Sequence, residues 1–177
     1  MGWPSVKTLK IGSIEIPLRS ALDCATAYEQ IGGETILRTI NGSGIRQETW
    51  KKLRATVSGS GWIPPGLDAV DSTQQQVVAF AAPLAVTCDG SRQATLPAGR
   101  RSDSGYTPWA IALLADGGII DTPVAVVGDT ATADAVADAI GYQAWYYPQI
   151  TAWVSRPSQS LEHQTATWSW ELFVEQV

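Results

Sequence analysis

The chain of 177 residues contains a single histidine, His163, which limits the catalytic chemistry that it can support. His163 lies in the polar stretch Ser160–Gln164, so we predict that it is an exposed surface residue. A Ser–His–Asp triad would need this histidine as its general base. A zinc site would need several ligands, and Cys24 and Cys88 are too far apart in sequence to form a typical metal-binding pair. We therefore expect neither a triad nor a bound metal.

Acidic and glycine-rich stretches do not indicate an active site. The carboxylates that could form a glycosidase pair are Glu29, Glu34, Asp68 and Asp71. Nothing in their spacing selects them from the other acidic residues. The aspartates at 129, 134 and 138 lack the spacing of a calcium loop, and the Gly-Ser-Gly runs at 42–44 and 59–61 do not match a phosphate-binding loop. The sequence thus predicts a protein that is not an enzyme and has no cofactor.

Eight tryptophans indicate a different kind of site, because exposed aromatic rings can serve as platforms for sugar rings. Those in apolar strands, expected in the core or at a subunit interface, are Trp109, Trp145, Trp153, Trp168 and Trp170. The better candidates for exposure are Trp3, Trp50 and Trp62. Trp50 lies close to several basic residues, and we expect it to be buried against another subunit.

The composition predicts a mainly β protein. Sixteen glycines and ten prolines indicate many turns, and 45% hydrophobic residues indicate a folded core. We expect an antiparallel β-sandwich or barrel with a long projecting hairpin and one or two short helices. One domain would span 1–177, with the hairpin around 34–58 and room for a small β lobe at 90–160.

Other strands are expected at 6–18, 75–88, 109–114, 119–127, 142–154 and 166–176. Prolines interrupt two of these ranges, at Pro83 and Pro148. The last strand alternates most regularly, with Trp168, Trp170, Leu172 and Val174 on one face and Thr167, Ser169, Glu171 and Glu175 on the other. Segment 130–140 could be a helix or a loop, and 21–27 and 67–71 could each form a helical turn.

The segment from Glu34 to Val57 reads as a long β-hairpin. Its first arm, Glu34–Ile40, is rich in β-branched residues, and Asn41-Gly42 suits a tight turn. The second arm, Ile45–Val57, could also be a helix, since Trp50, Leu53 and Val57 have helical spacing. Flanking glycines and β-branched residues favour the strand. A strand pair this long cannot bury all its faces in a domain of this size, so part of it should project and pair elsewhere.

Charge is distributed unevenly along the chain. Residues 1–54 contain eight basic and five acidic residues, whereas residues 55–177 contain four basic and twelve acidic residues. Such polarity would suit head-to-tail association of copies. The basic cluster of Arg46, Lys51, Lys52 and Arg54 could indicate binding to nucleic acid, but the net charge of −5 argues against specific binding.

No apolar run has the length of a membrane helix, and the N-terminus lacks a signal peptide. The cysteines could pair, although buried thiols in a reducing cytoplasm are the simpler reading.

Three stretches, YEQIGGETILRTINGSGIRQETWKKLRATVSGSGWIPPGLDAVD, RRSDSGYTPWA and TWSWELFVEQV, resemble small structural proteins encoded in the tail gene clusters of tailed bacteriophages. The resemblance covers most of the chain. It implies a virion protein of the tail or baseplate, assembled in the host cytoplasm, and a tube-like ring subunit near the tail tip. It also implies a β core, a hairpin that joins the neighbour's sheet and six-fold symmetry. The family supplies no catalytic residues.

The expected partners are copies of this chain and other tail or baseplate proteins. Segment 36–57 would extend the neighbour's sheet by backbone hydrogen bonds. The predicted interface residues are Ile36, Arg38, Ile45, Arg46, Trp50, Lys51, Lys52, Leu53, Arg54 and Trp62. The alternatives are a carbohydrate-binding β-sandwich acting at a host surface and a small glycan hydrolase.

Overall fold

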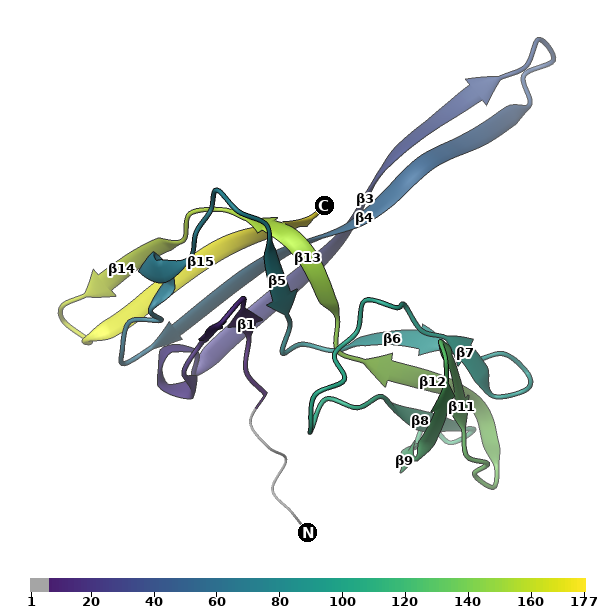
Figure 1. Cartoon of the computed structure of the whole chain (residues 1–177). Coiled ribbons are helices and arrows are strands. Elements are labelled where there is room, and N and C mark those ends of the chain that lie inside the picture. Colours follow the sequence, from purple (N-terminus) through teal and green to yellow (C-terminus); the bar gives the residue numbers. More distant parts are fainter. Residues whose placement is uncertain (1–6) are drawn as a thin grey trace. The chain divides into compact units, whose positions relative to one another are not determined.

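A computed structural model describes residues 7–177, and it is mainly β with open antiparallel sheets, as the sequence predicts (Figure 1). Within these residues the strands are β1 (Lys10–Ile11), β2 (Ile14–Glu15), β3 (Asp23–Arg38), β4 (Gly44–Gly61), β5 (Gln76–Ala79), β6 (Leu84–Thr87), β7 (Gln93–Thr95), β8 (Trp109–Leu114), β9 (Ile119–Thr122), β10 (Val124–Val127), β11 (Thr130–Ala133), β12 (Ala139–Tyr146), β13 (Gln149–Val154), β14 (Ser158–Glu162) and β15 (Thr167–Gln176). Two single-turn 3-10 helices, η1 (Leu18–Ser20) and η2 (Leu67–Ala69), are the helical elements of the same residues.

The chain divides into two compact units. The arm unit comprises Ile11–Val78 and Thr151–Val177, and the second unit comprises Ala79–Ile150 with the segment up to Lys10. The second unit thus covers most of the range in which the sequence leaves room for a lobe, and it also includes an N-terminal segment. The sequence does not indicate this inclusion, because it depends on contacts between residues about a hundred positions apart.

The arm unit is built on one sheet of strand order β2-β1-β5-β13-β15-β4-β3, with β14 also beside β15. The alternation predicted for the terminal strand is confirmed, since Trp170, Leu172 and Val174 are buried on one face of β15. Val57 of β4 pairs with Leu172 and is fully buried. The core of this unit therefore lies on one face of the β15–β4 pair. The other face is open.

The Ser-Gly-Ser-Gly run does not end the second arm of the hairpin, because β4 continues through it to Gly61. A Cβ at Gly59 would lie 2.5 Å from the indole of Trp170, and one at Gly61 would lie 2.1 Å from the carbonyl oxygen of Arg19. The Trp170 indole N–H donates to the Ser20 carbonyl at 2.6 Å. These glycines therefore let a tryptophan and a helical turn contact the strand directly. The local sequence does not predict this role of Gly59 and Gly61.

The second unit contains two small sheets, β6-β12-β8-β9 and β10-β11-β7. Its buried cluster consists of Ala94, Leu96, Ala131, Ala144 and Tyr146. The return strand expected at 119–127 is split at Pro123, and its two halves join different sheets. The helix considered for 130–140 is wrong. Residues 130–133 form strand β11 between β7 and β10, because alternate alanines there are buried.

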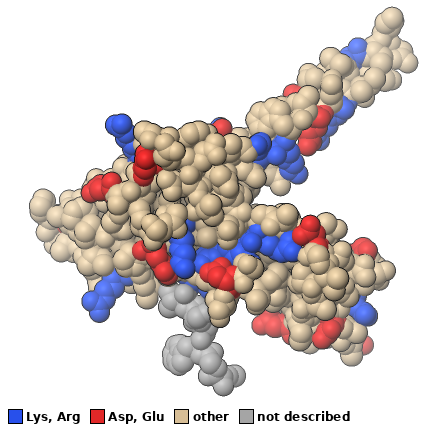
Figure 2. Space-filling view, in the orientation of Figure 1, with Lys and Arg blue, Asp and Glu red and all other residues tan. Residues whose placement is uncertain are grey.

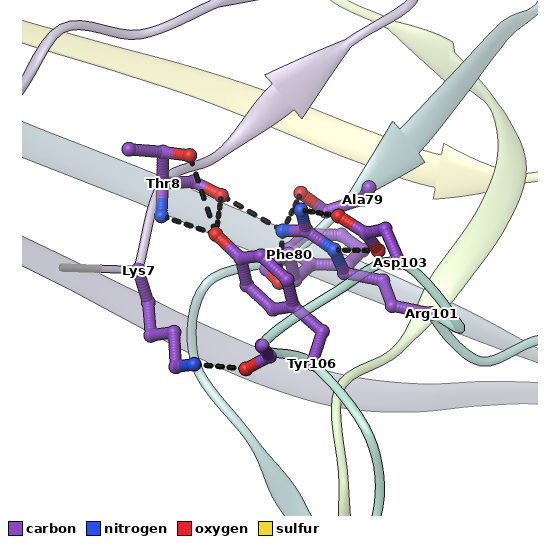
Figure 3. A network of polar contacts seen from close by, with 8 residues as sticks. Lys7, Thr8, Ala79, Phe80, Arg101, Asp103 and Tyr106 are labelled. Carbon is purple, nitrogen blue, oxygen red and sulfur yellow. Dashed lines mark hydrogen bonds and ion pairs between the residues drawn. The ribbon is translucent and has the colours of Figure 1, made fainter. Parts of the chain in front are cut away.

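A fully buried arginine, Arg101, connects separate segments of the second unit (Figure 3). The Arg101 guanidinium donates to the carbonyl oxygens of Thr8 at 2.8 Å and Phe80 at 3.1 Å. It also binds both carboxylate oxygens of Asp103, at 3.0 and 2.6 Å, and its carbon lies 3.2 Å from the centre of the Tyr106 ring. This one side chain links three segments that are distant in sequence. Its charge-assisted hydrogen bonds to these backbone carbonyl oxygens stabilise the interior of the unit.

Replacing Arg101 with Met should lower the free energy of unfolding by about 3 kcal/mol, because several carbonyl oxygens and one carboxylate lose a charge-assisted hydrogen bond. Chemical denaturation followed by circular dichroism measures this change. Arg156→Met, at an exposed arginine, is the matched control and should have almost no effect. Equal stability of the two variants would contradict the role assigned to Arg101.

Asp103 should make stability depend on pH. Hydrogen bonds from Arg101 lower the pKa of Asp103 below its usual value. The carboxylate therefore contributes stability above the unfolded-state pKa, and this contribution is lost as the pH falls through the folded-state value. Between pH 5 and about pH 3, the thermal midpoint of the natural chain should fall further than that of Asp103→Asn. If the thermal midpoints of the two proteins fell equally with pH, this contribution of Asp103 would be excluded.

Candidate interaction surface on the β3–β4 arm

Strands β3 and β4 form a hairpin that extends beyond the rest of its sheet (Figure 1). The two strands pair from Asp23 opposite Ser60 to Arg38 opposite Gly44, whereas β15 pairs with β4 only as far as Arg54. Every residue from 34 to 51 is exposed. We call residues 31–52 the distal arm. The strand predicted for the second arm is confirmed, and the helix is excluded.

The turn at the end of the distal arm forms where the sequence predicts it. Gly42 has a φ of 82°, in the left-handed region that favours glycine. Its N–H donates to the Thr39 carbonyl at 2.8 Å, and the Thr39 N–H donates to the Ser43 carbonyl at 2.9 Å. The Thr39 hydroxyl also contacts the side chain of Asn41. Local hydrogen bonds thus close a hairpin whose end is otherwise surrounded by solvent.

A β-bulge interrupts the distal arm. Gly33 is opposite Trp50, but Glu34 is opposite Glu48, so Thr49 is an extra residue on β4. The Thr49 hydroxyl donates to the Gly33 carbonyl at 2.8 Å. A Cβ at Gly33 would lie 2.5 Å from the Trp50 indole nitrogen. Glycine is therefore required here so that the indole can lie over the backbone.

The bulge decides which side chains share a face of the arm. Ile45 and Trp50 are five positions apart and would point to opposite faces of a regular strand. The extra residue puts them on one face. With their partners across the ladder, this face carries Ile31, Lys52, Trp50, Thr35, Gln47, Leu37 and Ile45, and we call it the apolar face because Lys52 is its one charged residue. The opposite, charged face carries Glu34, Glu48, Ile36, Arg46 and Arg38.

Ion pairs on the charged face confirm this division. Arg46 contacts Glu34 and lies 3.8 Å from Glu48. All three side chains are exposed, so these pairs contribute little to stability. Figure 2 shows blue and red atoms along the arm, separated by uncharged surface, and an end without charged atoms.

The apolar face continues onto the open face of the arm unit's sheet. The next row contains Arg54, whose guanidinium is 2.8 Å from Glu175 and 3.6 Å from Glu29. The hydrogen bond and charge of Glu175, followed by the charge of Glu29, raise the pKa of Arg54 above its usual value. Phe173 and Trp153 lie beside this row, are both exposed, and line a shallow depression with Thr56.

The end of β15 holds the base of the arm. The Leu53 N–H donates to the side-chain carbonyl of Gln176 at 2.8 Å, and the Lys52 ammonium contacts the Val177 carbonyl. The Val177 N–H in turn donates to Thr151 at 3.1 Å. These bonds fix the point at which β4 leaves its sheet.

The predicted interface residues fall into three groups. Those in the exposed part of the arm are Ile36, Arg38, Ile45, Arg46, Trp50 and Lys51, and those at its partly buried base are Lys52, Leu53 and Arg54. Trp62 is exposed but lies beyond the other end of β4, about 40 Å along the strand from Trp50. It is therefore not part of the same surface. Trp3 lies outside the described residues.

Several exposed apolar side chains were not predicted. They are Leu37 in the arm, Ile40 at its turn, and Trp153 and Phe173 on the open face. Phe173 could have been found, because it interrupts the polar side of an otherwise regular alternation. Trp153 was expected in the core or at an interface, and the structure excludes the core.

Other candidate residues have structural partners or stand apart. The carboxylates of the suggested glycosidase pair are engaged: Glu29 with Arg54, Glu34 with Arg46, Asp68 with Gln159 and Asp71 with Thr73. His163 lies exposed in the turn before β15. Cys24 and Cys88 are free thiols, and Cys24 is exposed rather than buried as expected. Among residues 7–177, no cluster of three His, Cys, Asp or Glu side chains could hold a metal ion.

Searches against family models, curated proteins and solved structures found no match to this chain. The described helical segments are all too short to cross a membrane.

Replacing Gly33 with Val should disrupt the distal arm, because the new side chain would collide with Trp50 and Thr49. Hydrogen exchange should become faster for the backbone amides of 34–38 and 44–49 while the global unfolding midpoint stays unchanged. Gly44→Val is the matched control, since its Cβ would meet only Ile36 at an ordinary 3.5 Å. Equal exchange in the two variants would mean that close approach at Gly33 does not hold the arm.

Proposed function

We propose that this protein is a structural subunit of a phage tail or baseplate, which forms a tube-like ring near the tail tip through its β3–β4 arm. The observation that carries this proposal is the distal arm itself. It is an antiparallel hairpin with one β-bulge, exposed on both faces from residue 34 to residue 51, and it extends from a sheet that is buried on one face elsewhere. An isolated two-stranded hairpin is marginally stable in water, so an arm of this length gains most from a partner.

Backbone pairing with a neighbouring copy would supply that partner. β3 is an edge strand of the sheet along its length, and β4 has no ladder partner other than β3 between Gly44 and Leu53, among the described residues. Both edges of the distal arm can thus add a strand. Repeating one such contact head to tail generates a ring or a tube. The resemblance of the sequence to phage tail proteins supports the ring and six-fold symmetry.

Specific binding to nucleic acid has less support. Of the four basic residues that suggest it, Arg46 pairs with Glu34, Arg54 with Glu175, and Lys52 contacts a backbone carbonyl. The charges of the two arginines are thus offset by carboxylates within the chain. An arm that contacts protein fits these pairs better than one that contacts phosphate.

A carbohydrate-binding module is the rival function. The exposure of Trp153 and Phe173 on an open sheet face favours it, because adjacent aromatic rings can stack on sugars. Binding to an array of glycans, lost in Trp153→Ala by a chain that stays monomeric, would support this rival over the ring.

Shortening the arm tests assembly. Replacing residues 35–47 with Asn-Gly should leave a two-residue hairpin that closes between Glu34 and Glu48, which are paired. The full chain should assemble into oligomers by light scattering and into rings by negative-stain microscopy, and the shortened chain should be a monomer with unchanged circular dichroism. Oligomers of the same size from both proteins would overturn the role of the arm.

The virion assignment needs its own test. Antibodies against this protein should label the tail or baseplate of particles of the virus that encodes it. Particles whose tails carry no label would refute the assignment, even if the purified protein forms rings.

A further inference from the structure

We infer that the apolar face is a one-sided docking surface for a second copy of this chain, with the end of one arm packed on Trp153 and Phe173 of the next copy. This inference rests on the proposed function, because it requires that copies associate through the arm. It adds which face of the arm makes the contact and what that face contacts. Backbone pairing at the edges specifies neither.

The bulge makes the arm one-sided. If Thr49 were paired with Glu34 in a regular ladder instead of forming a bulge, Arg46 rather than Ile45 would lie opposite Leu37, on the face of Trp50. As it is, the aliphatic side chains of Leu37 and Ile45 are directly paired on the same face as Trp50. The charged face has Ile36 as its one large apolar residue. A bulge that gathers apolar side chains on a solvent-exposed ribbon indicates a surface that is buried on assembly.

The same face carries a second apolar group at the other end. Phe173 lies opposite Thr56, and Trp153 lies opposite Glu175, within the wider part of the sheet. From the row of Phe173 and Thr56 to Leu37, the face runs ten residues along β3, or about 33 Å. It therefore has a narrow aliphatic end on the arm and a broad aromatic end on the open sheet. The aliphatic side chains of the arm suit the shallow depression that lies beside the aromatic end.

Charge on this face suits a second copy as the occupant. Between the two apolar ends, the charged side chains are Glu29, Glu175, Lys52 and Arg54, and their formal charges cancel. Arg54 already binds both carboxylates, and Lys52 contacts a backbone carbonyl. Two copies of such a face meet without net repulsion. A strongly acidic or basic partner would gain little from it.

A pair of isoleucines on opposite faces tests the inference. Ile45 is 55% exposed on the apolar face, and Ile36 is 65% exposed on the charged face of the same ladder. Ile45→Lys should weaken association at least tenfold, since it places a charge in the contact, whereas Ile36→Lys should change it less than about threefold. Sedimentation velocity over a concentration series measures both. Circular dichroism should be unchanged, because both residues are exposed.

Mixing variants tests the contact between arm and open face. Phe173→Lys should also prevent assembly, because it alters the receiving end. When Ile45→Lys and Phe173→Lys are mixed, one intact contact remains, between the arm of the second and the open face of the first. The mixture should form one-to-one dimers and nothing larger. A mixture that stays monomeric, or that forms full rings, overturns the head-to-tail contact.

The outcomes separate this inference from the proposed function. If the shortened arm abolishes assembly but Ile36→Lys and Ile45→Lys act equally, assembly by the arm stands and the one-sided surface is refuted. If the natural chain is a monomer at all concentrations, both fail. Glycan binding by that monomer, lost in Phe173→Lys, would instead assign the aromatic pair to a sugar.

Discussion

Backbone pairing between β15 and β4 stops at Arg54, and most of what is unusual in this protein follows from that stop. Up to that point β4 lies inside a sheet and alternates between a buried and an open face. Beyond it, the same strand has β3 as its neighbour and solvent on both sides. Bonds from Leu53 and Lys52 to the last two residues of the chain hold the transition in place. The structure thus stabilises the base of the arm and leaves its end to other interactions.

Glycine has two different roles in the β3–β4 pair. At Gly59 and Gly61 the missing side chains let Trp170 and the η1 turn contact β4, so that the core is closed at one end. At Gly33, on the partner strand, the missing side chain makes room for Trp50. A tryptophan lies over a glycine in both places, once inside the core and once in solvent. The first arrangement stabilises the subunit itself, and the second shapes a surface.

The sequence predicts the class of fold and the hairpin because both depend on local patterns. Alternation in the last strand, the Asn-Gly turn and the β-branched residues of the arm each act over a few residues. The bulge could not be predicted, since it depends on which residues of two strands lie opposite each other. For the same reason, the sequence does not reveal that Ile45 and Ile36 face opposite sides, or that Trp153 and Phe173 are left open.

Errors elsewhere have similar causes. Segment 130–140 has helical spacing, but Ala131 and Ala133 are buried in a strand that pairs on one side with β7, which is distant in sequence. The sequence groups Trp62 with Trp50 because neither belongs to an apolar strand pattern, although most of the length of β4 separates them. The burial of Arg101 cannot be predicted from the sequence, because a buried arginine is recognised only when its distant acceptors are known. Local pattern identifies elements, and tertiary contacts decide which of their residues work together.

The extra residue at Thr49 also has a consequence for how this surface can change over time. A single-codon insertion between Gly33 and Glu34 would give Thr49 a partner and leave the composition of the chain nearly intact, yet it would exchange the two sides of everything beyond it. Point substitutions would need several coordinated steps to reach the same result. An insertion opposite the bulge is therefore a short route by which related chains could acquire a different assembly geometry.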